Sequence, residues 1–471
     1  MLRVFSACYI STALAITLAG CSSPFDIPTS THSMPEASAS ALHSSIYRAM
    51  DSKDDSSSIR LDKTPESYIR YALYHNPEVE RAYQSWQAAA ARIPQLASLP
   101  DPRLNIGFFL NEVETRVGPQ QARVGIQQSF PWISKLRDRQ DAGAKAALAA
   151  WNQYIAAQLN TTQRVLSTLH DLSYLDSVIK ITDENLILLR SFEDIVRTQY
   201  RLSASSHSQL IRIQLERAQL EDRLVGFESL RPVYIAMLNA VLNRSSQTDV
   251  DIAFELPIRV ATQNAEQLFE LAFDSNPNLQ TLNHRIEQAR INTQLAHKQR
   301  YPDFTIGLDY IITDQAANSS VSESGDDPVM LSFGLSLPIW QDKYAAAKRE
   351  AIANRLALSR EFDTNTNMLS AQIARALFEH TDAARRADLY NNTLIPKAQE
   401  SLAASIVAFK TGNAQFIDLI DTQRTLLEFS LAAHNAIAEQ GKSLAMLNTL
   451  VGHPIETTNT DRTSPNSEDL P

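Results

Sequence analysis

The 471-residue sequence has little glycine, with only 12 residues, and only two cysteines. Alanine, leucine, glutamine and arginine are abundant instead, and this composition favours long helices over a β-rich or α/β enzyme fold. Positive charge is also in deficit, because the formal net charge is −10. A nucleic-acid partner, which would require a basic surface, is therefore not expected.

Residues arranged for catalysis or for metal binding are missing as well. The ten histidines are scattered and form no His-x-x-x-His or Glu-x-x-His set, and the seven methionines do not cluster as a soft-metal site would. A glycine-rich phosphate loop is also lacking. The sequence therefore predicts a protein that is not an enzyme and that has no cofactor and no metal site of its own.

Residues 1–20 are predicted to be a lipoprotein signal peptide. Arg3 provides the positive charge of such a signal, and the apolar run over residues 7–18 is too short for a permanent membrane helix. Small residues precede Cys21, whose thiol would accept the lipid, and Ser22 favours sorting to the outer membrane. An ordinary signal peptide that happens to contain a cysteine is the alternative.

The segments that flank the expected folded body are polar. Residues 21–63 are rich in Ser, Asp and Pro, which is typical of an extended tether behind a lipid anchor. Residues 456–471 have a similar composition and are expected to be disordered. Removal of Cys8 with the signal and acylation of Cys21 would leave the exported chain without a thiol for a disulfide.

The strongest signal in the sequence is an internal duplication. The matching positions are 200 residues apart in the first part of each half and 209 apart after a loop: Asn76-Pro77 with Asn276-Pro277, Pro102 with Pro302, Ile106-Gly107 with Ile306-Gly307, Gly125 with Gly334, Tyr200-Arg201 with Phe409-Lys410, and Met237-Leu238-Asn239 with Met446-Leu447-Asn448. The sequence predicts two homologous halves, residues 64–243 and 263–455, joined by a linker at 244–262. Each half is much longer than a solenoid repeat.

Each half is predicted to run helix, strand, loop, strand, long helix, turn, helix. The strands are expected at about 103–111, 122–130, 303–312 and 329–338, where apolar residues alternate with small or polar ones. Strands of this length cross an outer membrane at a tilt, and the loop at 313–327 has the composition of an exposed outer loop. A half-buried sheet in a soluble protein is the alternative interpretation of the same alternation.

The long helices are expected at 133–203, 206–243, 340–411 and 414–451. Proline and glycine are almost absent from them, and apolar residues recur at spacings of three and four. A helix of about 70 residues would extend roughly 105 Å, far beyond a compact domain. Four strands cannot close on themselves in lipid, so the chain is expected to pool its strands with two, three or four copies around a cyclic axis.

These features resemble the TolC-type outer-membrane efflux proteins over residues 64–455. The resemblance rests on the repeated Asn-Pro, on Pro100-Asp101-Pro102, on Phe130-Pro131-Trp132 and Leu337-Pro338-Ile339-Trp340 at the exits from strand to helix, and on the run from Leu394-Ile395-Pro396 through Phe409-Lys410-Thr411-Gly412 to Asp418-Leu419-Ile420-Asp421. It implies a mainly α fold with a small transmembrane β part. Four strands per protomer would contribute to a trimeric 12-stranded barrel above a periplasmic tunnel of long helices.

The resemblance also implies a function. The chain would be a homotrimeric exit duct in the outer membrane that works with a periplasmic adaptor and an inner-membrane pump of the resistance-nodulation-division type, with membrane lipid around it. One departure lies at the helical turns, because Ser203 occupies the first turn where the second has Gly412.

Candidate gate residues follow the second turn. Asp418 and Asp421 are three residues apart on one helix face, and the family places an acidic pair here at the periplasmic entrance. Six carboxylates in a trimer would attract cations. The equivalent positions in the first half are Gln209 and Arg212, and we hypothesise that Arg212 pairs with one of the aspartates across neighbouring helix pairs and holds the entrance shut. A solvated acidic face at a helix N-terminus is the alternative.

Two other functions fit parts of the sequence. The chain could be the exit duct of a type I protein secretion system, which would work with an ATP-binding cassette exporter. It could also be a lipid-anchored periplasmic coiled-coil protein without a pore, in which residues 104–130 and 304–337 form a soluble sheet or none.

Overall fold

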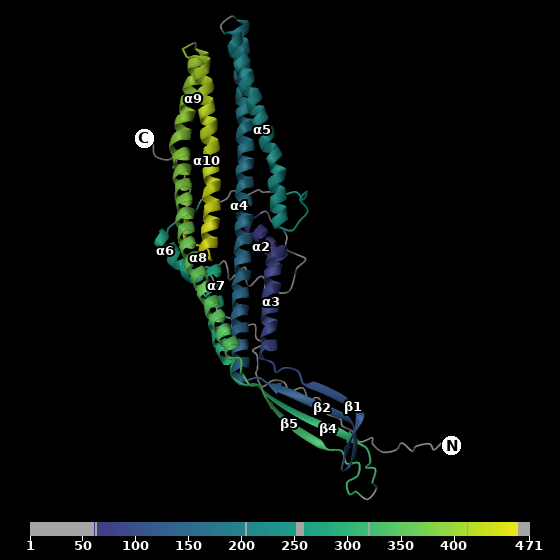
Figure 1. Cartoon of the computed structure of the whole chain (residues 1–471). Helices are drawn as coiled ribbons and strands as arrows, with labels where there is room; N and C mark the ends of the chain where they lie inside the picture. Colours follow the sequence, from purple (N-terminus) through teal and green to yellow (C-terminus); the bar gives the residue numbers. More distant parts are fainter. Residues whose placement is uncertain are drawn as a thin grey trace, which may run out of the picture.

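The computed structural model describes residues 61, 64–202, 205–250, 259–318, 321–411 and 413–459. The predicted signal, the tether with Cys21, and the turn residues Ser203 and Gly412 lie outside them. The described chain is elongated (Figure 1), with a four-stranded sheet at one end, a helical body in the middle and two separate helical hairpins at the other end. Among the described residues, none of the helices is both long and apolar enough to cross a membrane.

The two halves have the same order of elements. In the first half these are α2 (Pro65–His75), α3 (Pro77–Ala97), β1 (Arg103–Thr115), β2 (Gly118–Phe130), α4 (Ile133–Arg201) and α5 (His207–Val241). In the second half they are α6 (Ala265–Ser275), α7 (Pro277–Lys298), β4 (Phe304–Thr313), β5 (Val329–Leu335), α8 (Gln341–Leu389), a π-helical turn η1 (Tyr390–Leu394), α9 (Ile395–Lys410) and α10 (Phe416–Val451). The expected fold class, mainly α with a small β part, is confirmed.

The repeated Asn-Pro serves the same purpose in both halves. The Asn76 side chain accepts hydrogen bonds from the first turn of α3, and its Nδ2 donates to the carbonyl of Val241 at 2.8 Å. Asn276 caps α7 in the same way, and its Nδ2 donates to the carbonyl of Leu450 at 2.8 Å. Each asparagine therefore starts one helix and fixes it to the last turn of its own half.

Some boundaries differ from the sequence-based expectation. The helix expected over 340–411 is interrupted by η1, just before Pro396, which lacks the N–H needed to continue the helical hydrogen bonds. The strand expected to reach 338 ends at Leu335, because Pro338 has no donor for the ladder. Residues from the expected linker and tail form a two-stranded sheet, β3 (Arg259–Ala261) with β6 (Thr457–Asn459), whose partners are distant in sequence.

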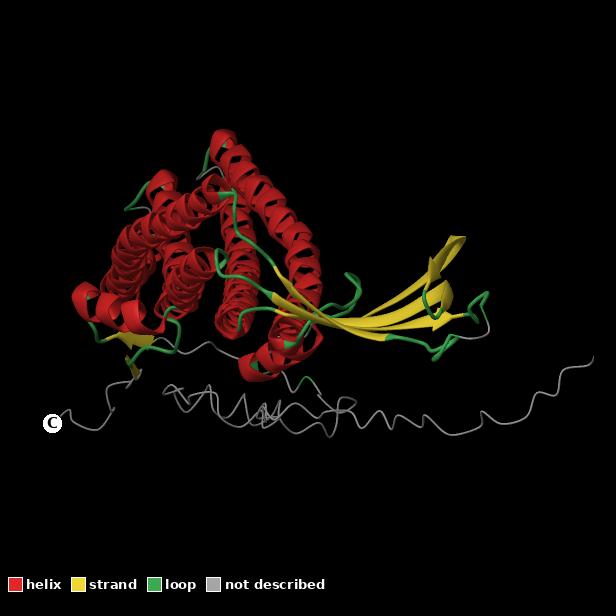
Figure 2. Cartoon of the chain, turned by 60° about the horizontal axis from the view of Figure 1, so that its bottom comes forward, coloured by secondary structure: helices red, strands yellow, loops and turns green. Residues whose placement is uncertain are grey.

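The larger sheet has the strand order β1-β2-β4-β5, with every pair antiparallel. The register places the alternating apolar residues of all four strands on one face, including Ile106 opposite Val124, Ile126 opposite Leu308 and Ile306 opposite Phe333. This face is open in the described chain, and the Phe333 side chain is 75% exposed. The sheet projects away from the helices (Figure 2), and its outer strands β1 and β5 each have one unpaired edge.

The opposite face of the sheet is polar. Asp309 on β4 forms a two-fold hydrogen bond with the Arg123 guanidinium at 2.7 and 2.9 Å. Gly125 on β2 lies directly opposite Asp309, and a Cβ there would be 1.9 Å from the Asp309 carboxylate. Gly125 thus leaves room for the Asp309–Arg123 pair, which any side chain at this position would displace.

The helices pack around α4, which contacts α3, α5, α7 and α10. One buried cluster surrounds the middle of α4, including Leu169 and Leu172. A second lies between the hairpins, where Phe409 and Phe416 pack with ring centroids 5.7 Å apart. A third cluster, which includes Leu268 and Leu447, joins α6, α8 and α10, so separate buried clusters follow one another along the helical body.

Candidate functional site at the hairpin ends

The helices that follow the two turns, α5 and α10, begin in a similar way. At the start of α5, the Ser206 hydroxyl accepts the N–H of Gln209 while the Gln209 side chain accepts the N–H of Ser206, both at 3.4 Å. At the start of α10, the Asp418 carboxylate accepts the N–H of Gln415 at 3.2 Å. Gln209 and Asp418 are 209 residues apart, so the duplication extends to these caps. Asp418 therefore helps to begin α10, at a helix N-terminus where the helix dipole favours an anion.

Asp418 and Asp421 are both exposed on α10. The Asp421 carboxylate lies 3.4 Å from the Arg424 guanidinium, which also contacts Glu216 on α5 at 2.5 Å. A second ion pair of opposite polarity joins Arg223 on α5 to Glu428 on α10 at 2.7 Å. These two pairs link the hairpins, and each contributes about 0–1 kcal/mol, because the side chains are partly exposed.

The pairing of Arg212 with an aspartate of a neighbouring helix pair is not formed among the described residues of the single chain, and between copies it stays a prediction. Arg212 is exposed on α5, and among the described residues it forms no ion pair with Asp418 or Asp421. Arg212 and Asp421 occupy equivalent positions of the two halves, so they point the same way relative to their own hairpins and do not face each other. In the pair nearer the turn the polarity is reversed, with the acid Glu216 on α5 and the base Arg424 on α10. The base-on-α5, acid-on-α10 polarity expected for Arg212 is found one step further along, in Arg223 and Glu428.

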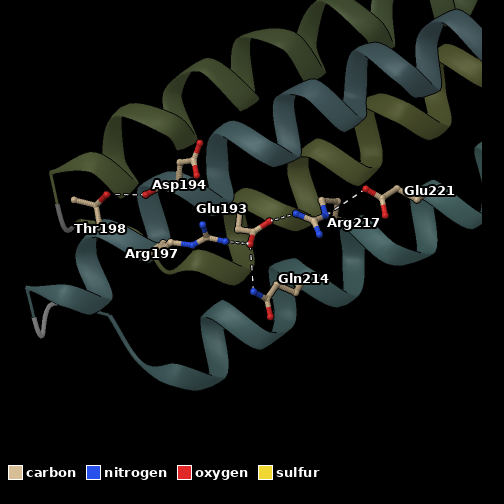
Figure 3. Close-up of polar contacts among 7 residues, drawn as sticks. All are labelled: Glu193, Asp194, Arg197, Thr198, Gln214, Arg217 and Glu221. Carbon is tan, nitrogen blue, oxygen red and sulfur yellow. Dashed lines mark hydrogen bonds and ion pairs between the residues drawn. The ribbon is translucent and has the colours of Figure 1, made fainter.

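The sequence analysis missed a buried ionic network inside the first hairpin (Figure 3). Only 3% of the Glu193 side chain is exposed, and its carboxylate is 2.6 Å from both the Arg197 and the Arg217 guanidinium. Gln214 Nε2 donates to the same carboxylate at 3.2 Å, and Arg217 also lies 3.4 Å from Glu221. The network joins α4 to α5 close to the turn.

The charge of Glu193 is maintained by these neighbours. Burial raises the pKa of the Glu193 carboxyl, but the hydrogen bonds from Gln214 and Arg197 and the charges of Arg217 and Arg197 outweigh it, so the pKa lies below the ordinary value. Glu193 is thus ionised at neutral pH although it is buried. Its contribution to stability is present above the ordinary pKa of about 4.3 and is lost as the pH falls through the lowered value.

A signal for this network was present in the sequence. Glu193 is four residues after Leu189 and three before Val196, both buried, so it occupies a core position of α4. Arg217 lies in the same way between Ile213 and Leu220 on α5. A glutamate and an arginine at facing core positions of a helical hairpin indicate a buried ion pair.

The two prolines predicted at the exits from strand to helix lie at the starts of α4 and α8. Pro131 is buried between β2 and α4, and the carbonyl of Pro338 accepts a hydrogen bond from Gln341 at the start of α8, at 2.6 Å. Cys21, Ser203 and Gly412 lie outside the described residues. Within the described ranges, no group of three or more His, Cys, Asp or Glu side chains is placed to hold a metal ion.

Comparisons with known proteins point in one direction. Residues 268–453 match the family described as outer membrane efflux protein. The chain is 20% identical over 408 residues to the cobalt-zinc-cadmium resistance protein CzcC of Cupriavidus metallidurans, covering 83% of this chain and 90% of that one. It is 21% identical over 404 residues to nodulation protein T of Rhizobium leguminosarum bv. trifolii, covering 82% and 85%.

Solved structures share the fold. The outer membrane protein VceC from Vibrio cholerae superposes with a TM-score of 0.69 at 16% identity, covering 83% of this chain and 97% of that chain. CusC, whose structures concern folding and transmembrane channel formation, superposes with a TM-score of 0.71 at 14% identity, covering 83% and 93%.

Proposed function

We infer that the chain, which belongs to the outer membrane efflux protein family, is the outer-membrane channel of an efflux system. The observation that carries this function is the sheet with one continuous apolar face and two open edges, joined end-on to a long helical body. The apolar face would contact lipid, and the polar face with Asp309 and Arg123 would line the lumen. The helical body then extends into the periplasm.

Oligomer formation follows from the edges of the sheet. The free sides of β1 and β5 carry backbone N–H and C=O groups that hydrocarbon cannot satisfy, so each must pair with a strand of another copy. We propose a homotrimer, in which four strands from each chain form a closed barrel of 12 strands. The number three comes from the family resemblance, and the edges support assembly in a ring.

The hairpin ends would form the periplasmic entrance. In a trimer, Asp418 and Asp421 would place six exposed carboxylates around one narrow opening. Like charges confined to a ring attract cations and oppose anions. We therefore propose that the entrance selects and binds cations through both residues, Asp418, which also caps α10, and Asp421, which also lies beside Arg424.

Removal of the acidic ring tests both the channel and its entrance. Reconstituted wild-type protein is expected to conduct in planar bilayers and to be blocked by polyvalent cations from the periplasmic side. The Asp418→Asn/Asp421→Asn variant should lose most of this block, by about tenfold or more in blocking concentration, because the ring charge is gone. The matched control is Asp388→Asn, an exposed aspartate far from the turn. Equal block in the variant and the wild type would contradict the ring.

The ion pairs between the hairpins are expected to restrain the entrance. Arg424→Ala removes the contacts to Glu216 and Asp421 and should raise resting conductance, because α10 is then held to α5 by one pair fewer. Arg212→Ala is the informative comparison, since it removes the same charge from α5. An effect of Arg212→Ala that exceeds that of Arg424→Ala would indicate that Arg212 pairs with an aspartate of a neighbouring copy.

The partners are proposed from the family and the relatives. We propose a periplasmic adaptor and an inner-membrane pump of the resistance-nodulation-division type, and lipid attachment at Cys21. The similarity to a cobalt-zinc-cadmium resistance protein supports metal ions as cargo, and the proposed acidic entrance suits cations. A deletion strain sensitive to divalent metals but competent in protein secretion would support this partner over a type I exporter. Absence of conductance together with a soluble delipidated monomer would favour the protein without a pore.

A further inference from the structure

A basic hollow lies where the helical body meets the sheet. It has a volume of about 420 Å³ and is lined by residues of the last turns of α7 and one residue of α8: Thr293, Gln294, His297, Lys298 and Lys348. The Lys298 ammonium lies 2.8 Å from Asp138 on α4. Lys348 is exposed, and in the described part of the chain no carboxylate lies within 4.0 Å of its ammonium.

Lys348 is the basic residue of the hollow that local helix stability does not explain. His297 and Lys298 end α7, where cations are favoured by the helix dipole. Lys348 is in the second turn of α8, where the dipole gives a cation no advantage. The chain as a whole carries a net charge of −10, so cations gathered around one hollow run against its average. A hollow of this kind is complementary to an anion.

A chain of aromatic rings connects the basic hollow to the apolar face of the sheet. His297 and Tyr301 have ring centroids 6.5 Å apart, Tyr301 and Trp132 are 5.6 Å apart, and Trp132 stacks on Phe304 at 6.0 Å. Phe304 belongs to the apolar face. It also borders a second hollow of about 270 Å³, formed with Phe130, Thr305, Ile306, Phe333 and Gly334. Along this path the basic hollow comes first, the aromatic rings follow, and the apolar hollow comes last.

We propose that the two hollows together bind one anionic phospholipid of the periplasmic leaflet. The phosphate would be held by Lys348, Lys298 and His297, and an acyl chain would lie in the hollow beside Phe304. Trp132 and Tyr301 would stand at the level of the glycerol backbone, the depth that aromatic side chains prefer in membranes. Basic pockets beside membrane-spanning segments bind lipid head groups in this way. The proposal rests on the sheet crossing the outer membrane, as inferred above.

Lipid titration of the full-length protein in detergent, followed by native mass spectrometry, tests the site. Wild type is expected to bind phosphatidylglycerol well above phosphatidylcholine. Lys348→Gln should weaken phosphatidylglycerol binding about fivefold and leave phosphatidylcholine unchanged, because one cation near the phosphate is lost. Lys397→Gln is the matched control, since it removes an exposed lysine from α9, far from the sheet, and should have no effect.

Three outcomes would overturn the proposal: no preference for phosphatidylglycerol in the wild type, equal losses in Lys348→Gln and Lys397→Gln, or full displacement of the lipid by millimolar inorganic phosphate, which would indicate a site for a free anion. The measurement is independent of conductance. A protein that binds phosphatidylglycerol but does not conduct would contradict the proposed channel and not the lipid site.

Discussion

Replacement of Leu215 and Val225 by aspartate is expected to abolish the proposed trimer. Both residues lie on an exposed apolar seam of α5, and each is 58% exposed in the single chain. The seam continues through residues at helical spacing on the same face: Ile211, Val233 and Met237. The exposed Asp222 and Ser229 lie among these residues, so the seam consists of apolar positions with polar ones between them. Five large apolar side chains exposed on one helix face indicate a protein contact, and in the proposed ring a neighbouring copy would cover them.

The double aspartate variant would bury six unpaired charges in the three interfaces. The cost of several kcal/mol for each interface exceeds what repacking could recover. Gly226 lies beside the seam, and a Cβ there would meet no atom of its own chain within 4 Å, so the space is available to a partner. Native mass spectrometry and heat-modifiable gel mobility are expected to show only monomers. Leu215→Met/Val225→Ile, which keeps the seam apolar, should remain trimeric. Persistent trimers in the aspartate variant would show that the seam faces water in the assembly.

Removal of both arginines from Glu193 is expected to destabilise the first hairpin by about 3 kcal/mol at pH 7, since it leaves a buried carboxylate with the Gln214 amide but no opposite charge. The Arg197→Ala/Arg217→Ala variant should therefore exchange amide hydrogens faster near the turn of α4 and α5, by about a hundredfold where exchange reports local opening. Arg190→Ala is the control, because Arg190 is 3.9 Å from Glu221 and both side chains are largely exposed. It should cost no more than about 1 kcal/mol.

The pH dependence distinguishes an ionic effect from a loss of packing. In the wild type the Glu193 pKa is lowered, so its contribution persists from pH 7 to pH 5 and is lost only below the ordinary value. In the variant, burial without arginines raises the pKa of Glu193, so the carboxyl takes up a proton and the deficit shrinks as the pH falls. Hydrogen exchange measured from pH 7 to pH 4.5 should show the difference in stability between the variant and the wild type becoming smaller. A difference that stays constant would attribute the loss to packing alone.

The fold could be predicted from the sequence because its main signals are local or repeated. Alternation of apolar and polar residues determines which strand residues share a face, and the register confirms that face in all four strands. Two features were out of reach. The pairing of Arg259–Ala261 with Thr457–Asn459 joins segments nearly 200 residues apart, and neither has a pattern of its own. The π-helical turn depends on how the backbone adjusts ahead of Pro396.

The candidate site was only partly accessible to sequence reasoning. Asp418 and Asp421 are close in sequence, so a helix at this position is enough to predict that both lie exposed on one face. Which residue an exposed side chain pairs with depends on how one helix is rotated relative to the other. The internal duplication does not reveal this rotation. Arg424 and Glu216 come from positions of the two halves that are not equivalent, so comparison of the halves could not find them. Glu193 was not predicted, because a charged residue at a core position of a helix does not follow the apolar pattern by which the core is recognised.

The two open strand edges have a genetic consequence. A copy whose β1 edge is damaged still offers an intact β5 edge, so it would enter rings and leave them unable to close. If half the copies in a cell carry such a defect and mixing is random, roughly one eighth of trimers would be built from sound copies alone. A mutation at one edge should thus behave as dominant over the normal gene. Deletion of the whole gene should be recessive.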